Sequence, residues 1–111
     1  MVQPTDYVTT LKKVLQDYMH LTPANGDIAT FESFDDDNGQ YVLLQSGWQG
    51  SKYLHGAFIH VQLKEGKLWI HYDGTEYGIA NDLVDAGIPN DAIVLGFRHP
   101  SMRAYTNFAA A

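Results

Sequence analysis

The chain has 111 residues, and its seven lysines and arginines face thirteen aspartates and glutamates, so its formal charge is −6 at neutral pH. This length is typical of one domain with a single hydrophobic core. Because the sequence contains no cysteine, a disulfide framework, a thiolate nucleophile and a cysteine-ligated metal site are excluded.

Apart from the adjacent Lys12 and Lys13, the basic residues are scattered singly along the sequence, and they form no cluster that could neutralise phosphates. We therefore expect no direct binding of nucleic acid. No apolar run approaches the roughly 20 residues that a membrane-spanning helix needs. The stretch from Met1 to Asp6 also lacks the basic start and the apolar run of a signal peptide. These features predict a cytoplasmic protein that does not insert into a membrane.

The first predicted element is a helix that opens at Pro4 or Thr5 and runs to about Tyr18. Its apolar residues recur at steps of three and four, which is the spacing of one helix face; they are Tyr7, Val8, Leu11, Val14, Leu15 and Tyr18. Pro23 and Asn25-Gly26 are breaker and turn residues that are expected to separate this helix from a first strand at about residues 27–34.

Three further strands are predicted at residues 40–48, 52–63 and 67–72, and Gly56 suggests a bulge or bend in the long middle one. The acidic run from Asp35 to Gly39 could be a calcium loop or a solvated turn. A calcium loop spreads its ligands over about twelve positions and closes with a glutamate. Asn38-Gly39 is instead a typical hairpin turn, so the acidic-turn interpretation is favoured.

A two-residue turn at Glu65-Gly66 would fix the pairing of the last two strands. One face would carry the apolar pairs Leu63–Leu68, Val61–Ile70 and Ile59–Tyr72. The other face would carry the pairs Gln62–Trp69, His60–His71 and Phe58–Asp73. This second face mixes aromatic and imidazole side chains, so we expect helices or a second subunit to cover it. The candidate interaction residues are Phe58, His60, Gln62, Trp69 and His71.

The predicted pair of His60 and His71 has two interpretations. Two cross-strand imidazoles beside an acid could hold a metal, with Asp73 or His99 as the third ligand. No His-Glu-x-x-His motif supports this, and a hydrogen-bonded or interfacial histidine pair is the favoured interpretation. We therefore assign no catalytic, cofactor or metal site. A small metal-dependent or acid/base enzyme using His60, His71, Asp73 and Glu76 stays as the alternative.

The best specified local structure is a second helix, predicted from Gly74 to Ala86. Asp73 would be its N-cap and Glu76 the capping-box partner. Ile79, Ala80, Leu83 and Val84 fall on one face, and Asn81, Asp82 and Asp85 fall on the other. Gly87 suits the left-handed position that ends a helix, Ile88 can contact Leu83, and Pro89 prevents continuation.

The remaining chain predicts less structure. Residues 93–97 form an apolar run that could be a short buried strand or an extended packing segment, and residues 101–108 could form a final helix. No linker, repeat or low-complexity tract divides the sequence. The fold class is therefore α+β over residues 1–111 as a single domain: an antiparallel sheet meander of four strands or slightly more, with an N-terminal helix and C-terminal helices packed on it.

Several blocks of the sequence resemble one known family. They are Leu68-Trp69-Ile70, Asp73-Gly74-Thr75-Glu76-Tyr77-Gly78-Ile79-Ala80, Gly87-Ile88-Pro89, Ile93-Val94-Leu95-Gly96-Phe97, Arg103 and Thr106-Asn107-Phe108-Ala109. Together with the first helix, Gly26-Asp27, Gly47-Trp48 and Ile59-His60, they closely resemble the XisI-like family, the fdxN element excision controlling factors of cyanobacteria. The block Asp73-Gly74-Thr75-Glu76 with Gly78-Ile79-Ala80 is the most specific part. The sequence differs from the pattern of this family at Arg98-His99-Pro100, where relatives tend to place the histidine directly after the phenylalanine.

This resemblance implies an accessory control factor in programmed excision of a DNA element, which is not a recombinase and not an enzyme. It also implies a companion protein, XisH, which looks like a restriction-endonuclease-type fold. An acidic domain suits contact with a basic partner. Besides the enzyme named above, a directionality factor that binds DNA directly is a further alternative to this control factor. We also expect a homodimer through the mixed sheet face, because soluble monomers rarely expose such a patch.

Overall fold

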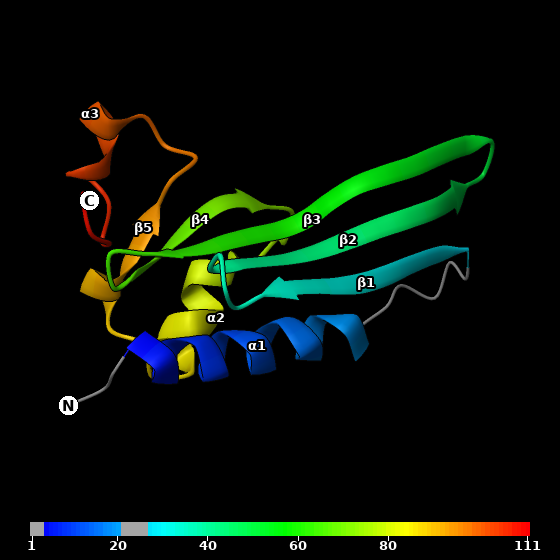
Figure 1. Ribbon diagram of the computed structural model, residues 1–111. Helices are drawn as coiled ribbons and strands as arrows, with labels where there is room; N and C mark the ends of the chain where they lie inside the picture. Colours follow the sequence, from blue (N-terminus) through cyan, green and yellow to red (C-terminus); the bar gives the residue numbers. More distant parts are fainter. Residues whose placement is uncertain (1–3, 21–26) are drawn as a thin grey trace.

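Figure 1 shows the computed structural model of the protein, which describes residues 4–20 and 27–111. In chain order the elements are α1 (Pro4–His20), β1 (Ile28–Asp35), β2 (Gln40–Gln49), β3 (Lys52–Lys64), β4 (Lys67–Asp73), α2 (Ile79–Asp85), η1 (Asn90–Ala92), β5 (Ile93–Leu95) and α3 (Pro100–Arg103). The predicted turn residues Pro23 and Asn25-Gly26 lie outside the described ranges. No helix within those ranges is long and apolar enough to cross a membrane.

The strands form one mixed sheet in the order β1-β2-β3-β4-β5. The first four pair antiparallel with their chain neighbours, which confirms the predicted meander. β5 pairs parallel with β4, with Leu68 opposite Ile93. A parallel neighbour requires a crossover connection, and α2 lies within it. The apolar run that had two interpretations is therefore a short strand at the edge of the sheet.

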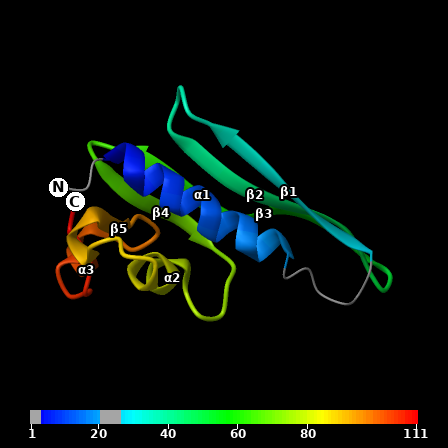
Figure 2. The same cartoon turned by 90° about the horizontal axis from the view of Figure 1, so that it is seen from below.

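The hydrophobic core lies between the sheet and two helices. Figure 2, seen from below, shows α1 and α2 on the same face of the sheet. Fully buried side chains from both helices meet those of three strands, which makes the predicted helix faces correct; they include Leu11, Leu15, Tyr41, Leu43, Ile59, Val61, Leu68, Ile70, Ile79 and Leu83. In Figure 1, α3 lies on the other side of the sheet, beside β5.

The turn between β3 and β4 has the predicted two-residue form. Glu65 and Gly66 both adopt positive φ angles, 54° and 78°, as a type I′ turn requires. The register that follows confirms the predicted pairs Leu63–Leu68, Val61–Ile70 and Gln62–Trp69. The strand alternation was therefore predicted correctly near this turn.

Further from the turn, a β-bulge overturns the predicted pairing. The register between β3 and β4 shifts between His60 and Val61, so that His60 lies opposite Tyr72 and Ile59 lies opposite Asp73. The predicted pairs His60–His71, Ile59–Tyr72 and Phe58–Asp73 are wrong, because His71 is an extra residue in β4. A bulge reverses the facing of every residue beyond it, and Tyr72 is accordingly exposed.

A second bulge lies in β3, but not at the predicted glycine. Gly56 pairs in register with Gln45, whereas the pairing with β2 skips Phe58. The Phe58 side chain packs against the helix-side core, with its ring 6.2 Å from that of Tyr18 on α1. The prediction that Phe58 shares a face with His60 and Gln62 is therefore wrong.

Helix α2 begins at Ile79 and not at the predicted Gly74. Asp73 folds back in an Asx-turn, because its Oδ1 accepts hydrogen bonds from the Thr75 N–H (2.9 Å) and from the Thr75 hydroxyl (2.6 Å). Such local bonds compete with helix formation. Gly78 then takes a φ of 96°, which lies outside the helical region. The chain therefore enters the helix only after a five-residue loop, Gly74 to Gly78.

The predicted end of α2 is confirmed. Gly87 has a φ of 105°, its N–H donates to the Val84 carbonyl at 3.0 Å, and the Ile88 N–H donates to the Leu83 carbonyl at 3.0 Å. These are the two bonds of a Schellman motif.

The predicted final helix is mostly absent. α3 covers only Pro100–Arg103. After it, the Ala109 N–H donates to the Ile93 carbonyl at 2.8 Å, and Ala109 forms a parallel bridge with Val94. Turns and bends follow α3, and the single bridge at Ala109 gives the outer edge of β5 a backbone partner.

Candidate functional site

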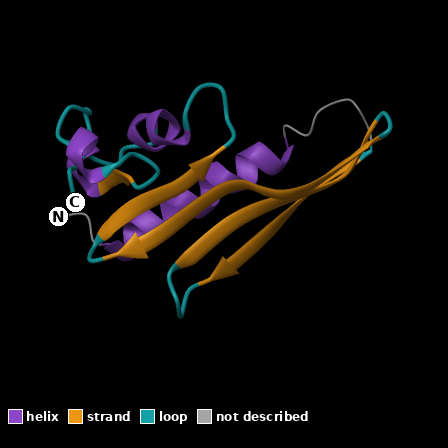
Figure 3. Cartoon of the chain, turned by 90° about the horizontal axis from the view of Figure 1, so that it is seen from above, coloured by secondary structure: helices purple, strands orange, loops and turns teal. Residues whose placement is uncertain are grey.

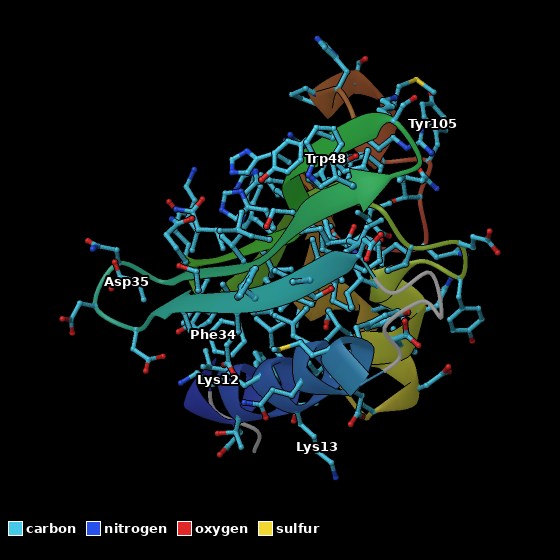
Figure 4. The ribbon with its side chains drawn as sticks, turned by 90° about the vertical axis from the view of Figure 1, so that its right-hand side faces the viewer. Lys12, Lys13, Phe34, Asp35, Trp48 and Tyr105 are labelled. Atoms are coloured by element: carbon cyan, nitrogen blue, oxygen red, sulfur yellow. The ribbon has the colours of Figure 1, made fainter. Side chains whose placement is uncertain are left out.

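Within residues 4–20 and 27–111, little covers the face of the sheet opposite α1 and α2. In Figure 3, seen from above, no helix crosses in front of β1, β2 or β3. Figure 4 places Trp48 on this side, whereas Phe34 lies between the sheet and α1. Five large apolar side chains are exposed on it, with exposed fractions between 39% and 54%: Phe31, Leu44, Trp48, Tyr53 and Tyr72. We call these residues, together with His60, Gln62, Trp69 and His71, the open sheet face.

The open sheet face is unusual in its lack of charge. Along the five described strands, the residues that alternate onto it carry no aspartate, glutamate, lysine or arginine except near the strand ends, where Asp35, Lys64 and Lys67 lie. Only the part of this face on β3 and β4 is predicted from the sequence. Tyr41-Val42-Leu43-Leu44 is apolar at every position, which is typical of a strand with both faces covered. That signal could have identified Leu44 as well.

His60 and His71 lie side by side on this face, although they are not register partners. Their ring centres are 5.0 Å apart. The His60 Nε2 lies 2.6 Å from the Gln40 Oε1, and the His71 Nε2 lies 2.8 Å from the Gln62 Oε1. An amide oxygen only accepts hydrogen bonds, so each Nε2 carries a proton in this arrangement. The structure therefore gives each imidazole a hydrogen-bonding partner.

Burial lowers the pKa of the His60 imidazole. Burial also lowers the pKa of the His71 imidazole, and the nearby positive charges of His60, Lys64 and Arg103 lower it further. Both rings consequently favour the neutral form in the folded protein.

These shifts predict a loss of stability in acid. The ordinary pKa of 6.5 applies to the unfolded chain, which binds more protons than the folded one below that value. The contribution to the unfolding free energy is intact above pH 6.5 and falls as the pH drops through the two folded-state pKa values. Denaturant titrations at about pH 7.5 and about pH 5.5 measure how much unfolding free energy is lost in acid. This loss should be smaller for a His60→Gln, His71→Gln double variant than for the parent protein. An equal loss in both proteins would contradict the assignment.

Trp69 is half-buried beneath two cations. The Lys64 Nζ lies 4.9 Å and the Arg103 Cζ 5.1 Å from the Trp69 ring centre. Arg103 also donates to the carbonyls of Gly96 (3.3 Å) and Arg98 (3.1 Å), which fixes the α3 segment over this end of the sheet. Trp69 thus contacts side chains of its own chain and is only partly available to another protein.

The residues of the alternative enzymatic site are not brought together. His60 and His71 lie on the open sheet face, whereas the Asp73 carboxylate is engaged by the backbone at the start of α2. His99 bonds to Ser101 and caps α3. Within the described residues, no group of three or more histidines and acidic residues could hold a metal ion.

The loop from Gly74 to Gly78 forms a second candidate site on the helix side. Asp73 Oδ2 accepts from the Ile79 N–H at 2.9 Å, in addition to the two bonds from Thr75 to Oδ1. The Thr75 hydroxyl accepts from the Gly78 N–H at 3.1 Å. Asp73 therefore caps the first residue of α2 from a distance of six residues. The predicted capping role of Glu76 is not seen: Glu76 is exposed and makes no such bond within the described residues.

Gly74 is needed where this loop touches β3. Its N–H donates to the Phe58 carbonyl at 2.7 Å. A Cβ at this position would lie 2.8 Å from both that carbonyl oxygen and the Phe58 Cδ1. Any larger residue would push the loop away from the bulge in β3.

A groove of about 690 Å³ separates this loop from the helix-side face of β1, β2 and β3. Tyr18, at the end of α1, lies at its edge and donates a hydrogen bond to Asp82. Burial, with the Asp82 carboxylate next in importance, raises the pKa of Tyr18 to about 12. The family motif Gly74-Thr75-Glu76 thus forms one wall of a groove, a role that the spacing of its residues did not indicate.

Comparison with known proteins agrees with this fold. The sequence model of the XisI protein family matches residues 1–110. A crystal structure of a XisI-like protein from Anabaena variabilis ATCC 29413 is 30% identical, with a TM-score of 0.89 over 98% of this chain and 100% of that one. A crystal structure of the fdxN element excision controlling factor XisI from the same strain is 35% identical, with a TM-score of 0.81 over 97% and 98% of the two chains. No curated protein sequence matches the chain.

Proposed function

Because this chain belongs to the XisI family, we propose that it is a non-catalytic control factor of DNA-element excision that acts by binding other proteins. The similarity to a fdxN element excision controlling factor supports the role in excision. The observation that carries the mode of action is the open sheet face, a partly aromatic surface whose charged residues lie only near its ends and which is typical of protein contacts. Such a factor works where the DNA is, so we place it in the cytoplasm.

The first partner is a second copy of the chain. A two-fold axis lets the open sheet face meet itself, which is the commonest way for a soluble protein to cover such a surface. Pairing of this face would bring no carboxylates together at its centre, although the chain carries a charge of −6. The acidic residues lie mainly on the helices, the turns and the loop before α2, and they would stay in water.

The second partner is a XisH-like companion. A chain with thirteen acidic residues suits a basic protein surface, because complementary charge favours the encounter and the correct orientation. In this proposal the companion contacts the DNA, and the present protein controls the companion without touching DNA.

A DNA-binding experiment tests this division of roles. The purified protein alone should not shift duplex DNA at low micromolar concentration and physiological salt, because it lacks clustered cations. The XisH-like companion should bind the protein and shift the same DNA in its presence. A shift by this protein alone that survives competitor DNA would contradict the proposal and favour a directionality factor that binds DNA directly.

A further inference from the structure

The groove beside the Gly74–Gly78 loop is built from three parts of the chain that are distant in sequence. One side of the groove is lined by the helix-side face of β1, β2 and β3, including Ile28, Leu54 and Phe58. Tyr18 of α1 closes one side, and the loop closes the other. Its volume of about 690 Å³ lies within the range of sites that bind ligands or peptide side chains.

Hydrogen bonds hold the backbone of the loop wall, while some of its side chains are exposed. The Asp73 carboxylate accepts three hydrogen bonds, and the Asn81 side chain donates to the Tyr77 carbonyl at 2.7 Å. Yet the Glu76 side chain is exposed, and the Tyr77 ring is 58% exposed. A fixed backbone that displays uncovered side chains reduces the entropy cost of binding.

The charge around the groove has one sign. Glu76 lines it, and an adjoining hollow of about 340 Å³, which shares Tyr18, is lined by Asp17, Asp82 and Asp85. Among the described lining residues of the two hollows there is no lysine, arginine or histidine. The side chains of Tyr18 and Tyr77 donate to Asp82 and Asp85, and no ion pair involves these carboxylates in the described part of the chain.

We propose that this groove is the docking site for a basic segment of the companion. An apolar side chain of that segment contacts Leu54 and Phe58, and an adjacent lysine or arginine meets the carboxylate of Glu76. Charge complementarity selects this occupant over a second copy of the acidic chain, whose own carboxylates would be repelled. The inference rests on the proposed function, because it names the surface through which the companion is bound.

Binding of the purified XisH-like companion to the full chain tests the site. Glu76→Lys reverses the charge on the loop that lines the groove, and Leu54→Ser removes an apolar side chain from the sheet face that lines it. Asp37→Lys is the matched control: it makes the same change in net charge in the exposed β1–β2 turn, at the other end of these strands from the Ile28–Gly47 pair. We expect Glu76→Lys to weaken binding about tenfold or more and Asp37→Lys to change it less than about twofold.

Two further measurements sharpen the result. Glu76→Gln should reduce the salt dependence of the dissociation constant, because the removed charge is one that salt screens. Leu44→Ser, on the open sheet face, should leave binding of the companion intact. Equal effects of Glu76→Lys and Asp37→Lys, or weakening by Leu44→Ser but not by Leu54→Ser, would overturn the groove while leaving the companion in place. A companion that does not bind the parent chain would overturn the proposed partner and the groove together.

Discussion

Leu44→Glu is expected to convert the protein from a dimer into a monomer. Leu44 lies near the middle of the open sheet face, opposite Phe31 on one side and Ala57 on the other. In a face-to-face dimer the two-fold axis brings the central residues of both copies together. A carboxylate there would be desolvated without a partner, which costs far more than its exposure on a monomer. Analytical ultracentrifugation at a concentration where the parent protein is dimeric should show only monomer.

Lys13→Gln provides the control for this result. It makes the same change in net charge, and Figure 4 places Lys13 on α1, on the other side of the sheet from Trp48. This variant should stay dimeric. The dimer should also weaken as the pH falls through the lowered pKa values of His60 and His71, because protonation would then place charge within the interface. A parent protein that is monomeric near neutral pH, or a dimer that is indifferent to Leu44→Glu, would rule this arrangement out. Trp69→Glu is a poorer test, since Trp69 also anchors Arg103.

Asp73→Ala is expected to lower the unfolding free energy by about 2 kcal/mol, since hydrogen bonds to a charged group contribute about 1.5–3 kcal/mol. The substitution leaves the backbone N–H groups of Thr75 and Ile79 without the acceptor that the structure gives them. It also frees the Thr75 hydroxyl, which holds the Gly78 N–H. Denaturant titration near neutral pH measures the change.

Asp85→Ala is the matched control for Asp73→Ala. Asp85 is the last residue of α2, but it is exposed and accepts a hydrogen bond from the Tyr77 hydroxyl at 2.7 Å. Its removal should cost less than about 1 kcal/mol. The loss of unfolding free energy for Asp73→Asn should lie between those of the two alanine variants, because one side-chain oxygen remains to accept hydrogen bonds. If Asp73→Ala abolished binding of the companion without changing stability, the carboxylate would be part of the recognition surface itself and not its support.

The sequence predicted the local structure best where one residue type has few alternatives. Glu65-Gly66 specified a tight hairpin, and the register next to it is correct. Gly87 and Pro89 specified the end of α2. In each case a backbone conformation that suits glycine or proline determined the structure.

The predictions that depended on strand alternation failed beyond the bulges. One inserted residue in β3 turned Phe58 toward the helices, and one in β4 turned Tyr72 toward water. Neither bulge has a distinctive residue, since the inserted positions are Phe58 and His71. They depend on packing between distant elements: Phe58 fits against Tyr18 and Gly74. The sequence alone could not specify these contacts.

The candidate sites were predicted in part. His60, Gln62, Trp69 and His71 do share a face, and the neighbouring histidines survive the register shift. The role of Asp73 at the start of α2 was anticipated, but not the loop that it folds. An N-cap and an Asx-turn begin with the same residue types. In this protein the Asx-turn at Asp73 occurs together with the hydrogen bond from the Gly74 N–H to the Phe58 carbonyl.

The parallel strand β5 has a consequence for the order in which the chain folds. Strands β1 to β4 pair with their immediate chain neighbours, so their ladders require only short loops to close. β5 and the bridge at Ala109 can form only after the chain has passed through α2, so one edge of β4 waits for residues 93–95 to be synthesised. A nascent chain that pauses before that point exposes the Leu68 to Ile70 edge to other chains. Once formed, β5 covers this edge of β4 and removes it as a site for pairing with other chains during synthesis.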